Sequence, residues 1–271
     1  MTRRAARAVP GFRLTLGMTL VWLIAIVMIP LTALATRPWS LGLAGIVQSL
    51  ADPRVLASLR LSFSTALGAA LIDVPLGLLL AWVLVRYRFP GRRILDGLID
   101  LPFALPTAVG GIVFAALYAG NGWLGHPLAA LGITIAYTPT GILIALAFVG
   151  LPFVVRTAEA LLRDLPAEVE EVAATLGARP GQIMLRVVLP ALLPALATGF
   201  GLAFARAVGE YGSVIFIAGN MPMRTEIAPL MIVIRLQQFD YAGAAALGLA
   251  MLLVSLACLA AVALLRRRLE V

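Results

Sequence analysis

Long apolar runs alternate with short polar segments along most of the chain. A helix that crosses a bilayer needs about 20 apolar residues, so six of these runs are candidate membrane spans. They lie at about residues 14–35, 59–85, 99–119, 138–155, 190–209 and 243–265. The first run exceeds the roughly 7–15 residues of a signal-peptide core and is expected to be retained as a span. The pattern predicts an all-α polytopic membrane protein with six transmembrane helices.

The segments between the runs are predicted to be loops. Residues 37–57 are mixed in character and are expected to form the first outer loop, and residues 210–240 a partly apolar outer segment. The run at 99–119 holds two prolines and paired glycines, which break helices in water but are tolerated where neighbouring helices satisfy the freed backbone groups. A single domain is expected over residues 1–271, with its core at about 57–265.

Residues 164–190 form the longest polar interruption of the apolar pattern. Pro166 suits the first turn of a helix, and the glutamates that follow it meet the positive end of the helix dipole. Gly177 is expected to end this helix, Pro180 to begin a second one, and Pro190 to end the second. The sequence thus predicts two short helices around a glycine turn.

An apolar stripe follows one face of the first of these helices. Its members recur at helical spacing and are Val169, Val172, Ala173 and Leu176. A stripe this narrow cannot fold alone, which indicates a docking surface for another protein. The alternative is a helix that lies on lipid headgroups. Such helices usually carry basic residues, whereas this one begins with Glu168, Glu170 and Glu171.

The composition is that of an integral membrane protein. Of the 271 residues, 62% are hydrophobic and 13% are charged, whereas soluble domains average about 25% charged residues. The mean hydropathy is +1.02. All 21 basic residues are arginine, and without lysine the chain cannot have a P-loop, whose lysine reaches the nucleotide phosphates. We therefore expect the chain to bind no cofactor, and any ATP it depends on to be hydrolysed by a different chain.

The arginines follow a membrane topology. A formal charge of +8 could indicate a nucleic-acid partner. With the N-terminus inside, however, the inner segments hold three times as many arginines as the outer ones, in accordance with the positive-inside rule. Six spans then leave both termini cytoplasmic and place residues 164–190 on the side where ATP is. Membrane lipid, rather than nucleic acid, is the expected surrounding.

Little in the sequence indicates catalysis. The single histidine, His126, has no second ligand nearby, so a metal site is not expected. The single cysteine, Cys258, lies in an apolar run, where cysteine behaves as a small hydrophobe. A membrane enzyme would need a nucleophile–base pair or a Gly-x-Ser-x-Gly motif, and the sequence contains neither.

One motif within residues 164–190 resembles the EAA loop of ATP-binding-cassette importer permeases. It reads Glu171-Val-Ala173, three residues, Gly177, nine residues, then Val187-Val-Leu189-Pro190. The family pattern has alanine where this chain has Val172, and isoleucine where it has Val187. The resemblance implies the type I importer permease fold and a coupling helix that inserts into a cleft of an ATPase subunit. The residues expected to serve that contact are Val169, Glu170, Glu171, Val172, Ala173, Leu176 and Gly177.

Later segments resemble a narrower group within that family. The run Ala205-Arg206-Ala-Val-Gly209-Glu210-Tyr-Gly212 is similar to the molybdate and sulfate branch. The residues that follow, to 241, are most similar to the T-type subunits of sulfate/thiosulfate importers. This resemblance implies transport of sulfate or thiosulfate across the bacterial inner membrane. The implied partners are an ABC ATPase subunit dimer, a second, related permease of the W type, and a periplasmic sulfate/thiosulfate-binding protein.

Two alternatives remain open from the sequence. A molybdate/tungstate permease would share the pattern at residues 205–220. A secondary transporter or channel would have a similar composition, but it has no use for a cytoplasmic docking segment. Secondary transporters also commonly show inverted repeats, which we do not detect in this sequence.

Ionisable residues inside the spans are candidates for a translocation pathway or gate, because each is costly to place in a bilayer. They are Asp73 in the second span and Arg206, one turn before Glu210, in the fifth. Arg206 is expected either to add positive potential to an anion pathway or to pair with Glu210 or Asp73. A carboxylate would repel an anion, so Asp73 is expected to be a structural partner. The outer loop at 220–226 could contact a soluble binding protein or only cap the bundle.

Overall fold

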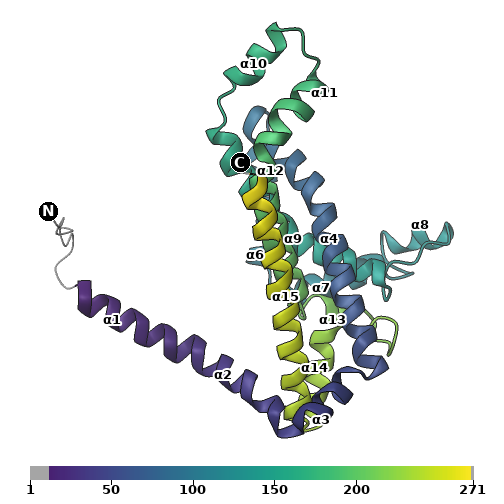
Figure 1. Ribbon diagram of the computed structural model, residues 1–271. Coiled ribbons are helices and arrows are strands. Elements are labelled where there is room, and N and C mark those ends of the chain that lie inside the picture. Colours follow the sequence, from purple (N-terminus) through teal and green to yellow (C-terminus); the bar gives the residue numbers. More distant parts are fainter. Residues whose placement is uncertain (1–11, 270–271) are drawn as a thin grey trace, which may run out of the picture.

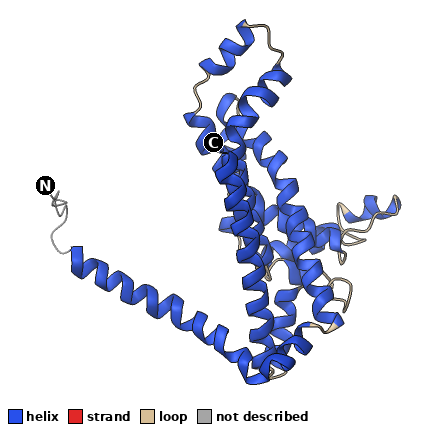
Figure 2. Ribbon diagram, viewed as in Figure 1, coloured by secondary structure: helices blue, strands red, loops and turns tan. Residues whose placement is uncertain are grey.

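A computed structural model describes residues 12–269 of the chain. Within this range the regular structure is all helical, with loops and turns between the helices and no strand (Figures 1 and 2). The helical stretches in this range that are long and apolar enough to cross a membrane are Leu14–Leu50, Pro53–Arg86, Pro139–Asp164, Pro180–Val208 and Tyr241–Leu264. The predicted all-α membrane fold is confirmed, with five such stretches in place of six.

The N-terminal part of the described chain forms a helical arm that leaves the bundle (Figure 1). The arm consists of α1 (Phe12–Leu23), a π-helical turn (Ile24–Met28) and α2 (Ile29–Thr36). A 3₁₀ turn (Arg37–Leu41) and α3 (Gly42–Leu50) follow and pack against the last helix of the bundle. Most large apolar side chains of the arm are exposed. An exposed apolar helix of this length suits a lipid-facing span, as predicted for the first apolar run.

Helical structure replaces the outer loop that was predicted at residues 37–57. Gly42 adopts a φ of 66° and redirects the chain into α3, which is mostly apolar. The polar residues belong to helix ends: the Asp52 carboxylate accepts a hydrogen bond from the Arg54 amide at 2.8 Å and caps the next helix. The loop prediction was wrong because capping residues at closely spaced helix ends resemble a loop in composition.

Three long helices pack together and form the core of the bundle. They are α4 (Pro53–Arg86), α9 (Pro139–Asp164) and α12 (Leu189–Val208). Glycines allow the close approach: a Cβ added to Gly77 of α4 would lie 2.7 Å from the Val154 Cγ1 of α9. A Cβ added to Gly199 of α12 would lie 2.8 Å from the Cα of the same valine. The last helix, α15 (Tyr241–Leu269), packs against α12 and matches the predicted sixth span.

The apolar run at 99–119 is not one continuous helix, contrary to the prediction. It follows α5 (Arg92–Ile99) and divides into α6 (Leu101–Ala104) and α7 (Thr107–Tyr118). Pro106 causes the break, because the residue before a proline is forced into extended backbone. The 12 residues of α7 extend about 18 Å, against the roughly 30 Å of a bilayer core. This helix spans only part of a membrane and packs on the segment after α12.

The outer segment predicted at 210–240 is mostly helix and turn. It contains α13 (Val214–Ile217) and α14 (Ala228–Gln237). The Ala228 amide donates to the Ser62 Oγ of α4 at 2.8 Å. The Glu226 carboxylate lies 2.7 Å from the Arg54 guanidinium, which is also on α4. These contacts fix the segment to one end of α4.

A helical hairpin projects from the opposite end of the bundle (Figure 1). It comprises residues 164–190, and its helices are α10 (Glu168–Thr175) and α11 (Pro180–Ile183). Helix α9 leads into this hairpin, and α11 leads out of it through a π-helical turn (Met184–Val188) into α12. The hairpin is therefore joined directly to two of the three core helices.

The sequence predicted that Pro190 ends the second helix, and this prediction was wrong. The helix is continuous from Pro180 to Val208. Pro190 has no amide hydrogen to donate, and the π turn just before it shifts the bonding by one residue: the Leu189 amide donates to the Met184 carbonyl, five residues back. The chain thus continues from the hairpin into the core without a break.

Candidate functional site

The hairpin is a preformed structure with a defined turn. Gly177 adopts a φ of 86°, a left-handed conformation that side chains disfavour. The Gly177 amide donates to the Ala174 carbonyl at 2.9 Å, and the Ala178 amide to the Ala173 carbonyl at 3.0 Å. This pair of bonds is a Schellman motif, which ends α10 and satisfies its last carbonyls. The predicted glycine turn is confirmed, and it joins the short helix α10 to the long helix that begins at Pro180, in place of a second short one.

The apolar stripe of α10 is exposed. The exposed fractions are 42% for Val169, 57% for Val172 and 83% for Leu176. Ala173 is half-buried, and Glu171 is exposed. A row of exposed apolar side chains on a projecting hairpin is a surface that lacks a partner within the described chain.

Glu170 faces the bundle instead of the exposed side of the hairpin. Its carboxylate lies 2.7 Å from Arg86 Nη2 at the end of α4. Arg86 Nε donates to the same carboxylate at 2.8 Å, and Arg86 Nη2 donates to the Leu165 carbonyl at 3.0 Å. Both charged side chains are largely buried, at 16% and 17% exposed. Among the residues predicted for coupling, Glu170 therefore anchors the hairpin, and the stripe is presented outward.

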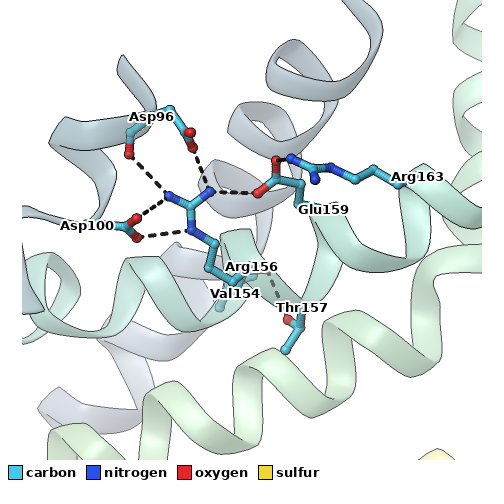
Figure 3. A network of polar contacts seen from close by, with 7 residues as sticks. All are labelled: Asp96, Asp100, Val154, Arg156, Thr157, Glu159 and Arg163. Atoms are coloured by element: carbon cyan, nitrogen blue, oxygen red, sulfur yellow. Dashed lines mark hydrogen bonds and ion pairs between the residues drawn. The ribbon is translucent and has the colours of Figure 1, made fainter. Parts of the chain in front are cut away.

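A second ion-pair network lies where α9 emerges from the core (Figure 3). Arg156 of α9 lies 2.6 Å from the Asp96 carboxylate of α5 and 2.5 Å from that of Asp100, just after α5. It also pairs with Glu159 at 2.7 Å, and Glu159 pairs in turn with Arg163. The network joins α5 to the part of α9 that leads into the hairpin.

No pattern in the sequence identifies this network. The one available signal was the pair of acids at positions 96 and 100, a spacing that would place both on one face if the helix extended to residue 100. Their partner lies 60 and 56 residues away along the chain. Spacing alone cannot identify a partner so distant.

Arg206 pairs with Glu210 at 2.5 Å, one of the two pairings expected from the sequence. Glu210 lies past the end of α12, so rules for pairs within a helix do not apply to it. Its carboxylate is buried and also accepts bonds from the Ser213 amide at 2.9 Å and hydroxyl at 3.0 Å. Arg206 keeps 36% of its side chain exposed. The pair fixes the turn after α12.

Asp73 lies in the core, against α9 and α12. It is 1% exposed, and neither carboxylate oxygen has a hydrogen-bond partner among residues 12–269. A Cβ added to Gly150 of α9 would clash with its Oδ2 and would also touch the Ala203 Cβ of α12. The expected structural pairing of Asp73 is therefore not found in the described part of the chain.

The described residues hold no cluster of three or more histidine, cysteine or acidic side chains suited to a metal ion. His126 is an exposed residue of the short helix α8 (Gly125–Ala130). The features that describe the candidate site are therefore its ion pairs, the packing of its helices and the exposed apolar stripe on α10.

Comparison with known proteins places this architecture. Residues 73–271 match the family model of the binding-protein-dependent transport system inner membrane component. The chain belongs to this family. It is a multi-pass membrane permease component, and its hairpin contains the EAA-like motif noted in the sequence.

The sequence similarity to individual relatives covers almost the whole chain. The sulfate transport system permease protein CysT of Escherichia coli K12 is 45% identical over 262 residues, covering 97% of this chain and 95% of the relative. A probable sulfate transport system permease protein cysT from Nephroselmis olivacea is 46% identical over 246 residues, covering 91% and 87%.

Solved structures support the same fold. A bacterial alginate ABC transporter in complex with an alginate-bound periplasmic protein contains a chain that superposes with a TM-score of 0.78. The identity is 18%, and the match covers 95% of this chain and 94% of that one. At this level of identity the likeness establishes the fold, which is that of an ABC importer permease.

Proposed function

We propose that this chain is the membrane-spanning permease subunit of an ATP-driven importer for sulfate and thiosulfate. The observation that carries the proposal is the 45% identity to a sulfate transport system permease over 97% of this chain. The exposed stripe on an anchored hairpin supports ATP-driven transport, because it supplies a docking surface for a separate motor subunit. The relatives are permeases by name, and a chain without lysine cannot form a P-loop of its own.

The proposed complex contains the chain, a related second permease, two ATPase subunits and a periplasmic binding protein. It lies in the bacterial inner membrane, with both termini and the hairpin on the cytoplasmic side. The support for this orientation is the excess of arginines at that end. In this orientation α3 and α14, which lie at the far end of the bundle from the hairpin, face the periplasm (Figure 1).

The hairpin is proposed to transmit motion from the ATPase to the bundle. The exposed stripe would provide the grip on the ATPase, and the Schellman turn at Gly177 gives the hairpin a fixed shape. Helices α9 and α12 run from the hairpin directly into the core, and Arg86 links the hairpin to α4. Displacement of α10 would then move all three core helices relative to the rest of the bundle.

The test is transport by the purified complex in proteoliposomes with ATP inside. We expect uptake of radiolabelled sulfate that requires the binding protein and ATP, and competition by thiosulfate. Competition by molybdate at lower concentration than by thiosulfate would instead assign the importer to molybdate and tungstate. Uptake that continues without ATP would contradict the proposed coupling.

A further inference from the structure

A pocket lies beside α4, far from the hairpin. It has a volume of about 410 Å³ and lies between the first turns of α4 and the loop that precedes α14. Its lining includes Arg60 and Ser64 from α4 and Arg224 from the loop, and the remaining lining residues are apolar. No carboxylate lines this pocket within the described chain.

The position of Arg224 beside α4 is fixed by contacts on both sides of the loop. Glu226 accepts two hydrogen bonds from Arg54, each at 2.7 Å, in a bidentate pair. Thr225 is buried, and its hydroxyl accepts a bond from the Met221 amide at 2.9 Å. The loop is therefore held in a defined shape, and the pocket is a built feature of the fold.

Two acidic residues near the pocket already interact with Arg54. Glu226 binds the Arg54 guanidinium, and Asp52 accepts a bond from the Arg54 amide. Arg60 and Arg224 are exposed, and neither guanidinium group has a hydrogen bond or an ion pair with any of residues 12–269. Two unneutralised guanidinium groups on one pocket repel each other, and a bound anion would remove that repulsion.

We propose that this pocket is an outer binding site for a doubly charged tetrahedral oxyanion, held by Arg60 and Arg224. The inference rests on the proposed function and adds a binding site at the outer end of the translocation pathway. Guanidinium groups suit this ligand because their parallel N–H donors match two oxygens of one anion. The Ser64 hydroxyl now donates to the Leu61 carbonyl at 3.1 Å, and its rotation would supply a further donor.

The exposure of both arginines suits a transit site. A transported ion must be bound well enough to enter and weakly enough to leave. Guanidinium groups in contact with water provide such an intermediate attraction, which screening by salt limits. In the proposed orientation the pocket lies on the periplasmic side, where a binding protein would release its cargo.

The test uses the complete complex in proteoliposomes, with sulfate uptake measured against the concentration of loaded binding protein. For the double variant Arg60→Gln, Arg224→Gln we expect about tenfold slower maximal uptake, because each arginine supplies charged hydrogen bonds. The binding-protein concentration that gives half-maximal uptake should not change. Arg37→Gln, which alters an exposed arginine outside the pocket, is the matched control and should leave both quantities unchanged.

The other outcomes are distinct. A higher half-maximal concentration of binding protein with an unchanged maximal rate would overturn the proposal, since the arginines would then dock an acidic residue of that protein. Unchanged uptake by the double variant would also overturn it, while leaving the proposed function intact. Failure of the wild-type complex to take up sulfate, with an active ATPase, would overturn both.

A second measurement detects the anion directly. Ala57→Cys in a Cys258→Ser background places the sole thiol of the chain in the lining of the pocket and keeps both arginines. In the assembled complex, without binding protein, bound sulfate should slow the reaction of this thiol with an uncharged reagent, and an equal ionic strength of chloride should not. An equal effect of both salts, or no effect of sulfate, would contradict a site.

Discussion

The Arg86 guanidinium at the end of α4 lies 2.7 Å from the Glu170 carboxylate in the first turn of α10. This ion pair joins a core helix to the projecting hairpin across 84 positions of sequence. The other two core helices, α9 and α12, continue into the hairpin through the chain itself. Helix α4 does not, and among the described salt bridges only the Arg86–Glu170 pair joins α4 to the hairpin.

Removal of either partner of this pair should weaken coupling. Arg86→Gln and Glu170→Gln should each slow sulfate uptake more than they reduce ATP hydrolysis, because the hairpin would move without α4. A double-mutant cycle on the stability of the complex should give a coupling of about 1–2 kcal/mol, between the values of exposed and buried pairs. The exchanged variant Arg86→Glu, Glu170→Arg should recover part of the uptake. Equal uptake in wild type and both single variants would contradict the link.

The turn of the hairpin requires glycine. Gly177→Val places a β-branched residue at a φ of 86°, where left-handed backbone costs roughly 1–2 kcal/mol. We expect a protein that inserts normally but loses ATP-coupled uptake. Gly181→Ala is the matched control, since an added Cβ there meets no atom within 4 Å, and its uptake should equal that of wild type. A loss of uptake of similar size in both variants would show that the turn conformation is not the cause.

The contact between Asp73 and Gly150 leaves no space for a larger residue. Gly150→Ala would place a methyl group against the Asp73 carboxylate and should destabilise the bundle by about 1–3 kcal/mol, measured as thermal unfolding in detergent. Gly110→Ala, at a buried glycine with open space, should change stability little. Adding Asp73→Ala to Gly150→Ala should restore stability. A double variant that is no more stable than Gly150→Ala would show that the Asp73 carboxylate is not the group with which the added methyl clashes.

The Arg156 network should contribute to stability mainly through Glu159, whose side chain is 6% exposed. Arg156→Gln leaves Asp96 and Asp100 in contact with water, but removes one partner from the buried Glu159 carboxylate. We expect a loss of about 2 kcal/mol, below the value for a fully buried pair. Arg163→Gln is the control: that side chain is 61% exposed, and Glu159 would keep Arg156. A larger loss for Arg163→Gln than for Arg156→Gln would contradict this order.

The long helices and the hairpin could be predicted because they follow from local chemistry. Apolar runs of sufficient length specify α4 and α15, and Gly177 and Pro180 specify the turn. The broken third run was missed because proline is tolerated in many membrane helices, and only the packing of α7 on α13 shows which outcome occurs here. The continuous helix through Pro190 depends on a π turn that no residue pattern announces.

The candidate site was predictable in part for the same reason. The stripe on α10 follows from helical spacing, whereas the orientation of Glu170 depends on Arg86 in a distant helix. The partners of Arg156, and the absence of a partner for Asp73 among residues 12–269, likewise depend on tertiary structure. Charges that pair across the bundle carry no signature in the order of the residues.

The most direct test of the central claim is cross-linking from the tip of the stripe. Leu176→Cys in a Cys258→Ser background has its only thiol on the hairpin. In assembled complexes we expect cross-linking to the ATPase subunit, with a yield that changes when ATP is bound. In intact cells a membrane-impermeant thiol reagent should not react with it. Labelling from outside the cell, or cross-linking to lipid alone, would contradict a cytoplasmic hairpin that couples the ATPase to transport.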